Sequence, residues 1–251
     1  MTRVAPAFDP YGPPDAPRRI ARGLWIVDGP EIRFHYLGLA WPFPTRMTIL
    51  ALADGGLWLH SPVQPTGRLF AAVERLGPVR HLIAPNTLHY WWIPEWKARF
   101  PDAVVHLAPG LAARSKQPLP PGPTLSPDAP SAWRGQIDQV VVRGDALTEV
   151  VFFHRASRTL ILADLIENFE PERVHSRWLR AVLRLGGAVD PCGQAPIDMQ
   201  LSFWRARRQV RHAARQMVAW GPVRVILAHG RWYRRDAVTE LRRAFRWTGL
   251  S

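Results

Sequence analysis

Cysteines and long uncharged runs are scarce in this chain of 251 residues. Its single cysteine, Cys192, excludes an internal disulfide and a zinc ribbon, both of which need several cysteines. The longest run without a charged residue, residues 81–94, has 14 residues, whereas a membrane-spanning helix needs about 20 apolar ones. Residues 1–20 contain arginines and prolines but no apolar stretch of the secretory kind. We therefore expect a cytoplasmic protein without a transmembrane segment.

Acidic residues are scarce in the last third of the chain. Residues 173–251 carry 16 basic and 4 acidic side chains, whereas residues 1–172 carry 17 and 16. The net charge of +13 therefore lies almost wholly in the last third. Only two of the 33 basic residues are lysines, a ratio that GC-rich coding alone explains. This arginine-rich third is either a surface for a polyanion such as nucleic acid, or a set of solvated helix faces.

With 47% apolar and 21% charged residues, the composition is that of a globular protein. Residues 1–22 predict a proline-rich N-terminal leader, and residues 23–251 a single domain. Short strand-like runs alternate with helical patterns, which predicts two α/β halves packed sheet against sheet with helices outside. The predicted strands are residues 24–27, 32–39, 47–53, 57–60, 79–84, 103–107, 139–142, 149–153, 159–163 and 223–227. The predicted helices are residues 67–76, 92–100, 109–114, 174–185, 203–220 and a last one from Asp236 to Trp247.

Polar residues directly follow four of the predicted strands. In α/β sheets, ligands gather beyond the carboxyl ends of the strands. Histidine and carboxylate side chains at converging strand ends are ligands that a divalent metal ion uses. The four segments are His60-Ser61, Asn86 with His89, Asp164, and His229.

In the order and spacing of these segments, the sequence resembles the metallo-β-lactamase superfamily over residues 24–247. The loop that begins at Pro85-Asn86 and contains His89 corresponds to the first metal motif of that superfamily. Ala163-Asp164 looks like its later Gly-Asp, and His229-Gly230 like its last histidine ligand. The resemblance implies a four-layer αββα sandwich. The sequence looks closest to an uncharacterised branch with a Pro-Asn-x-x-His loop followed by tryptophan and, further on, Phe-Pro-Asp-Ala, here residues 100–103.

The first motif departs from the superfamily pattern, because Tyr90 and Trp91 stand where an aspartate and a histidine are expected. The remaining candidate metal ligands are His89, Asp164 and His229, with His60 as an outside candidate. They suffice for one divalent ion, zinc or iron, or for none. The resemblance then implies a mononuclear hydrolase of a small ester-, amide- or lactone-like substrate, with His89 and Asp164 also as catalytic residues.

A substrate pocket is expected beside this site. Its candidate residues are Asn86, Tyr90, Trp91, Trp92 and His60, although the aromatic ones are equally suited to a core that fills space left by lost ligands. Two other functions stay open: an inactive descendant that binds a ligand or partner, and a polyanion-binding module that uses the arginine-rich third. The other histidines and Cys192 are interpreted as structural or surface residues; these histidines are His35, His81, His106, His154, His175 and His212.

Overall fold

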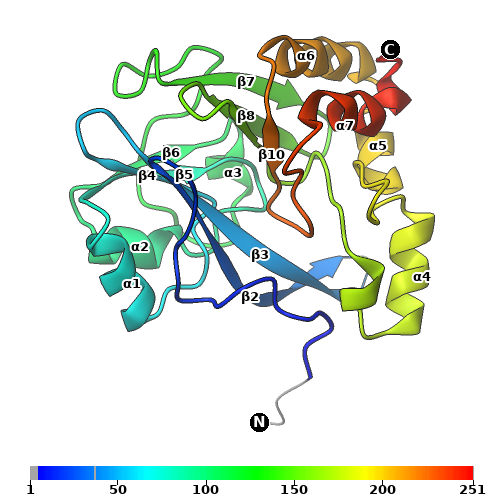
Figure 1. The fold of residues 1–251 in the computed structure, drawn as a ribbon, viewed down its shortest axis with the longest axis horizontal. Helices are drawn as coiled ribbons and strands as arrows, with labels where there is room; N and C mark the ends of the chain where they lie inside the picture. The colour runs from blue at the N-terminus through cyan, green and yellow to red at the C-terminus, as the bar shows by residue number, and fades with distance from the viewer. Residues whose placement is uncertain (1–4, 37, 251) are drawn as a thin grey trace.

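Two β-sheets face each other through the middle of the molecule, with helices on their outer sides (Figure 1). The computed structural model describes residues 5–36 and 38–250. The first sheet has the order β1-β2-β3-β4-β5-β6 and the second has the order β10-β9-β8-β7. The strands of the first sheet are β1 (Arg18–Ala21), β2 (Leu24–Tyr36), β3 (Leu39–Ala51), β4 (Leu57–His60), β5 (Val79–Ala84) and β6 (Val104–Leu107). Those of the second are β7 (Ile137–Arg143), β8 (Thr148–His154), β9 (Thr159–Ile161) and β10 (Arg224–Ile226).

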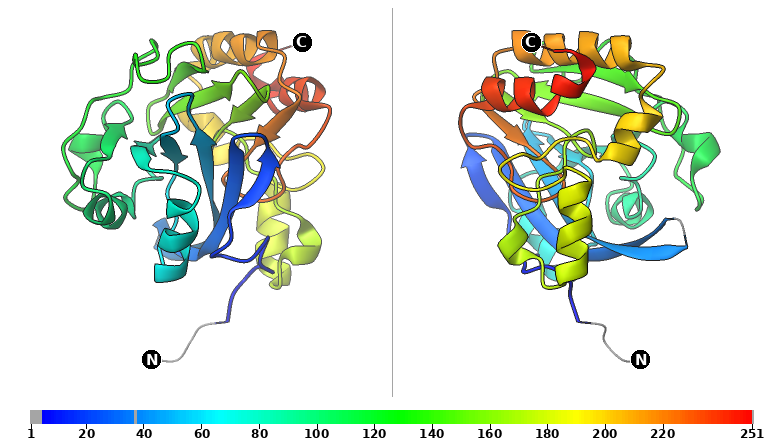
Figure 2. Two further views of the ribbon diagram at one scale, coloured as in Figure 1. Left: turned by 60° about the vertical axis from the view of Figure 1, so that its left-hand side comes forward. Right: turned by 90° about the vertical axis from the view of Figure 1, so that its right-hand side faces the viewer.

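The helices complete the outer layers. Helix α2 packs on β5 of the first sheet, and α6 packs on β7 of the second and against α7. Figure 2 shows α4 and α5 along one side of the molecule, where they border both sheets. The helices are α1 (Gly67–Glu74), α2 (Ile93–Arg99), α3 (Leu111–Arg114), α4 (Arg177–Leu185), α5 (Ile197–Ser202), α6 (Arg207–Ala219) and α7 (Ala237–Ala244), with 3₁₀ turns at Pro171–Arg173 and Arg246–Thr248. The predicted αββα sandwich is confirmed. Within the described part of the chain, no helix has both the length and the apolar character needed to cross a bilayer.

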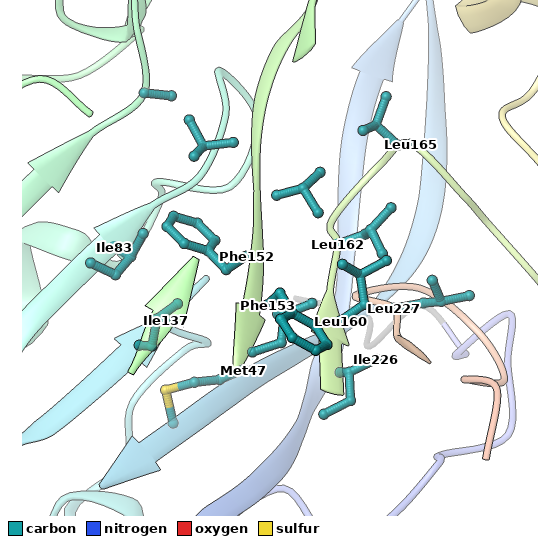
Figure 3. Packing of buried hydrophobic residues seen from close by; sticks show 14 of the residues in the cluster. Met47, Ile83, Ile137, Phe152, Phe153, Leu160, Leu162, Leu165, Ile226 and Leu227 are labelled. Atoms are coloured by element: carbon teal, nitrogen blue, oxygen red, sulfur yellow. The ribbon is translucent and has the colours of Figure 1, made fainter. Parts of the chain in front are cut away.

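The main core lies between the two sheets. Figure 3 shows side chains from both: Met47 and Ile83 from the first sheet meet Phe152 and Leu160 from the second. Trp58 packs edge-on against Phe152, with ring centroids 4.9 Å apart. In strands with one buried face, the core residues alternate with outward-facing ones. In strands covered on both faces, apolar residues follow one another, as the apolar runs of the sequence predict.

The sequence Asp28-Gly29-Pro30 predicts a turn between the strands 24–27 and 32–39, but this prediction is wrong, because β2 runs through all three residues. Strand β2 pairs with β3 along almost its whole length, and a bulge between Gly29 and Ile32 absorbs the irregularity. The carbonyl of Pro30 accepts a hydrogen bond from Thr45 Oγ1 (2.9 Å). The turn-forming residues at this point therefore shape a bulge inside a long strand instead of ending it.

Strand β3 starts at Leu39, eight residues before the predicted strand that begins at Met47. The sequence does not predict a strand here because it contains Pro42 and Pro44, and proline is rare inside a sheet. They fit because β3 pairs with β4 only from Thr48 onward. The first half of β3 is therefore an edge on that side, where a missing N–H costs no ladder bond. Residue 37, within the predicted strand 32–39, lies outside the described residues.

Two further short elements were not predicted. Strand β1 lies inside the proline-rich leader and pairs with β2. Helix α5 occupies Ile197–Ser202, where six residues are too few for a clear helical period. The other predicted strands and helices are present with ends shifted by a few residues.

Candidate metal centre

Three loops that follow β5, β9 and β10 converge at one end of the sandwich. They carry His89, Asp164 and His229, respectively. Strands β9 and β10 are parallel neighbours, so their carboxyl ends bring Asp164 and His229 to the same edge. Strand β5 ends at the facing edge of the other sheet, and its loop brings in His89. The sheets thus assemble a site from residues 75 and 140 positions apart in the sequence.

The three side chains form a nearly equilateral triangle of ligand atoms. His89 Nε2 lies 3.2 Å from Asp164 Oδ1 and 3.1 Å from His229 Nε2. His229 Nε2 lies 3.1 Å from the same Asp164 oxygen. All three side chains are largely shielded from solvent. Although burial alone would raise it, the two histidines hold the pKa of the Asp164 carboxyl well below its usual range.

The outward-facing atoms of the same side chains are also fixed. His229 Nδ1 donates to the carbonyl of Pro44 (2.7 Å), so a neutral His229 turns the lone pair of Nε2 toward the triangle. His89 Nδ1 lies 2.6 Å from Ser61 Oγ. Asp164 Oδ2 accepts a hydrogen bond from Asn86 Nδ2 (2.6 Å). Such partners of the non-ligating atoms orient histidines and carboxylates in metal sites.

The donor set fits one divalent ion. Ligand atoms bound at about 2.0–2.2 Å to a tetrahedral ion lie roughly 3.3–3.6 Å apart, and the observed separations of 3.1–3.2 Å need only a slight widening. The lone pair of His229 Nε2 also points at a carboxylate oxygen, an arrangement that a cation or a proton must relieve. Three protein ligands leave a fourth position open, as in catalytic zinc sites.

A buried acid–amide pair supports Asp164 and His89 from behind. Asn86 is fully buried, and its Oδ1 accepts the backbone N–H groups of Leu88 and His89, both at 2.9 Å. Glu149 accepts the N–H groups of Ala163 (2.8 Å) and Asp164 (2.7 Å). It also accepts from Asn86 Nδ2 at 3.1 Å. Burial and the nearby charge of Asp164 raise the pKa of Glu149 to about 7, against these hydrogen bonds. This pair fixes the loop after β5 to the loop after β9.

A buried arginine holds the loop that carries His229. Arg46 Nη1, from β3, donates to the carbonyls of Leu227 (2.6 Å) and Gly230 (2.9 Å). Its Nε pairs with Asp28 at 2.7 Å. Gly230 has a φ of 78°, and a Cβ there would overlap the backbone of Asn168. The short turn after β10 therefore needs both the arginine and the glycine.

The site lies at the wall of a cavity of about 560 Å³. Apolar side chains make most of its surface, and the polar groups gather around the triangle. Glu167, buried in the same cavity, accepts no hydrogen bond at its carboxyl group from the described residues. Burial raises its pKa to about 8, with smaller opposing effects from His229 and from Asp164 and Asp198.

Three of the five predicted pocket residues line the cavity, and two do not. Tyr90, Trp91 and Trp92 line the cavity, and Tyr90 also accepts the N–H of Lys116 (2.9 Å). Asn86 lies behind the triangle and outside the cavity lining. His60 is almost fully buried between the rings of Trp58 and Phe152.

Burial and the neighbouring His89 lower the pKa of His60 to about 3. Other histidines lie away from the triangle: His106 contacts His81 Nδ1 through Nε2 (3.2 Å), and His154 contacts Ser157 (2.8 Å). Cys192 is exposed in a loop.

Sequence reasoning missed Ser61, Glu149 and Glu167. Ser61 was noticed beside His60, but its φ of 54° turns the serine, and not the histidine, toward the site. Glu149 is the first residue of the predicted strand 149–153, a position where a carboxylate is expected to be exposed to solvent. Its fully buried position depends on the loop from the other sheet. Glu167 follows Asp164 by three residues, and this spacing was the available signal.

The fold and the site together define a protein with the metallo-β-lactamase fold. A metallo-β-lactamase from Pontibacter korlensis is similar, with a TM-score of 0.58, 16% identity and coverage of 94% of this chain and 99% of that one. FIM-1 from Pseudomonas aeruginosa in its mono-zinc form gives a TM-score of 0.59, 15% identity and coverage of 95% and 99%. A metallo-β-lactamase from Hirschia baltica gives a TM-score of 0.59 and 12% identity, and the match covers 94% of this chain and 98% of that one. At these identities the likeness concerns the fold.

A family model places the chain more narrowly. The model of a domain of unknown function (DUF4336) matches residues 39–176, more than half of the chain. The protein belongs to this family. The matched segment contains His89 and Asp164, and His229 lies beyond it. A comparison with curated proteins finds no match.

Proposed function

We propose that this protein is a mononuclear metal-dependent hydrolase of a small, largely apolar ester or amide. The triangle of His89, Asp164 and His229, open to an apolar cavity, is the observation that carries the proposal. Zinc suits two imidazole nitrogens and one carboxylate oxygen, and ferrous iron accepts the same ligands. The mono-zinc form of FIM-1 supports one ion as sufficient occupancy for this fold.

The chain's own residues have definite roles in this reaction. A bound divalent ion supplies Lewis acidity and a nucleophilic water near neutral pH. Trp91 and Trp92 hold the apolar part of the substrate against the cavity wall. Glu167 lies in the same cavity, where burial raises its pKa, and it would donate a proton to the leaving group. Asn86 and Ser61 fix the orientation of Asp164 and His89.

Metal content tests the proposal directly. Protein purified without chelator and equilibrated with zinc should contain about one ion per chain. We expect His89→Ala and His229→Ala to reduce this content strongly, because each removes one of three ligands. His212→Ala, which changes an exposed histidine of α6, is the matched control and should keep the ion.

Thermal unfolding gives a second readout that does not depend on an assay substrate. An ion that binds only the folded chain stabilises it, so chelator should lower the Tm of the wild type and leave that of His229→Ala unchanged. A wild type with far less than one ion per chain and no response to chelator would contradict the metal site. The protein would then fit the alternative of a descendant that only binds a ligand.

A second candidate mechanism rests on Ser61. Ser61 lines the cavity with its Oγ 2.6 Å from His89 Nδ1, and His89 Nε2 is 3.2 Å from Asp164, which is the order of a serine–histidine–aspartate triad with the two ring nitrogens exchanged. Ser61 Oγ would bond to the substrate carbonyl carbon and pass its proton to His89, which returns it to the leaving group; water then releases the acyl group. We rank it second because Pro62, directly after Ser61, has no N–H to stabilise an oxyanion.

A fluorophosphonate probe separates the two mechanisms. If Ser61 is the nucleophile, intact-mass analysis of the chelator-treated protein shows one adduct, which Ser61→Ala abolishes. If the metal mechanism holds, chelator-treated wild type stays unlabelled at Ser61. In that case Ser61→Ala weakens metal binding without removing it, because His89 loses only an orienting contact.

A further inference from the structure

Large apolar side chains are exposed around the mouth of the cavity. Leu185 is 84% and Leu201 is 66% exposed, and all five members of the group are more than half exposed. Leu185 and Ile197 also line the cavity, so the group borders its entrance. We call this group the apolar rim: Trp178, Leu185, Ile197, Leu201 and Trp204.

Four members of the rim lie on two helices, and Trp204 follows the end of α5. Trp178 and Leu185 are seven residues apart in α4, and Ile197 and Leu201 are four apart in α5, spacings that align side chains along a helix. The two helices meet where Ile197 N donates to the carbonyl of Gly186 (3.2 Å). The ring of Trp178 stacks on Trp41, a cavity residue, at 5.6 Å. Figure 2 shows α4 and α5 together on the side of the molecule that faces the viewer in the right-hand panel.

Arginines accompany the apolar rim. Arg177 and Arg184 are exposed and form a row on α4 directly beside Trp178 and Leu185. Residues 174–208 contain six arginines and two aspartates. An apolar row with tryptophan, bordered by a row of arginines, is the pattern of a helix that lies in the interface of an anionic membrane.

We propose that the apolar rim docks on an anionic lipid bilayer, with the cavity mouth turned toward the lipid. A second copy of the chain is the main other occupant of such a surface. A symmetric dimer through this face would bring its arginines against those of the partner, where like charges repel. Anionic headgroups complement the same arginines, and the acyl region accepts the leucines and tryptophans. Lipophilic molecules would then reach the cavity directly from the membrane.

Vesicle flotation tests this docking. We expect the wild type to float with vesicles of phosphatidylcholine and phosphatidylglycerol, to float far less with phosphatidylcholine alone, and to be released by added salt. Leu201→Asp should weaken binding about tenfold, because a leucine side chain loses its place in the acyl region. Arg184→Gln should weaken it about fivefold.

Two exposed residues outside the rim provide matched controls. Val223→Asp places the same charge at another exposed apolar position, and Arg75→Gln removes an arginine from the end of α1. Both should bind as the wild type does. Equal losses in Val223→Asp and Leu201→Asp would overturn the proposal. So would the absence of vesicle binding, or a dimer in sedimentation that Leu201→Asp dissociates. If Arg184→Gln weakens binding while Leu201→Asp has no effect, the surface is a general polyanion site and the proposal also fails.

The docking proposal does not depend on the proposed hydrolase. His89→Ala removes a candidate metal ligand at the cavity wall and leaves the rim unchanged, so this variant should float with anionic vesicles as the wild type does. Failure of metal binding and failure of docking are therefore separate results.

Discussion

Asn86 is the residue that connects both halves of the candidate metal centre. Its amide group donates to Asp164 and Glu149 with its nitrogen and accepts two backbone N–H groups of its own loop with its oxygen. All four hydrogen-bonding positions of the side chain are therefore used. Aspartate has almost the same shape but no donor, so it would face two carboxylates without a hydrogen bond. The amide is therefore required by its surroundings.

Replacing Asn86 by alanine should weaken metal binding by about 10–100-fold, the usual effect of losing a group that orients ligands. Asp164 Oδ2 then has no amide donor, and the loop that carries His89 has no acceptor for two of its N–H groups. A zinc titration against a competing chromophoric chelator measures the change. Thr87→Ala, at the neighbouring half-buried position that lines the cavity, is the control and should bind zinc normally. Equal affinities of both variants would show that Asn86 does not orient the ligands.

At the scale of elements, β3 links the two sheets through one side chain. Arg46 extends from β3 to the turn after β10, and it pairs with Asp28 on β2 at the same time. Arg18 from β1 adds a second partner for Asp28 at 2.9 Å. A buried guanidinium with three satisfied contacts fixes the geometry of the turn, since its donors point in set directions. The position of His229 thus depends on a residue of the opposite sheet.

Arg46→Met should destabilise the protein by about 3–5 kcal/mol, because it leaves two carbonyls without their donor and the buried Asp28 carboxylate with Arg18 as its remaining cation. For a chain of this size the corresponding fall in Tm is about 10 °C. Differential scanning calorimetry measures it. Adding Asp28→Leu should restore part of the loss, since the double variant no longer buries an underpaired charge. The single variant Asp28→Leu completes the cycle. If the loss of stability in the double variant equals the sum of the losses in the two single variants, the two residues are not coupled.

Local sequence patterns were sufficient for most elements and for three of the site residues. Apolar runs that end in His89, Asp164 or His229 predicted where the strand ends meet, because parallel strands present their carboxyl ends at one edge. The first half of β3 was not predicted. It tolerates Pro42 and Pro44 because it has no strand partner on one side, and the sequence does not reveal that missing partner. Ser61 and Glu149 escaped for a related reason: a backbone φ and a contact between sheets decide their roles.

At the scale of the whole molecule, buried histidines make the free energy of unfolding depend on pH. Burial, and then the charge of His81, lower the pKa of His106 to about 3, and burial lowers those of His81 and His154. None of these three belongs to the metal triangle. In the unfolded chain a histidine binds a proton at about pH 6.5. At these three sites the unfolded state therefore binds more protons than the folded state as the pH falls below 6.5, so their contribution to stability is fully present above pH 6.5 and is lost at lower pH.

We expect His106→Gln to flatten this acid loss. Glutamine keeps a polar group next to His81 but does not titrate, so the fall in unfolding free energy between about pH 6 and pH 4 should become shallower by about 1.4 kcal/mol per pH unit. Urea unfolding at several pH values, with chelator present throughout, measures the slope for the wild type and the variant. His212→Gln, at an exposed position, should reproduce the wild-type slope. Parallel curves for His106→Gln and the wild type would mean that burial does not lower the pKa of His106 in the folded protein, and would contradict the prediction.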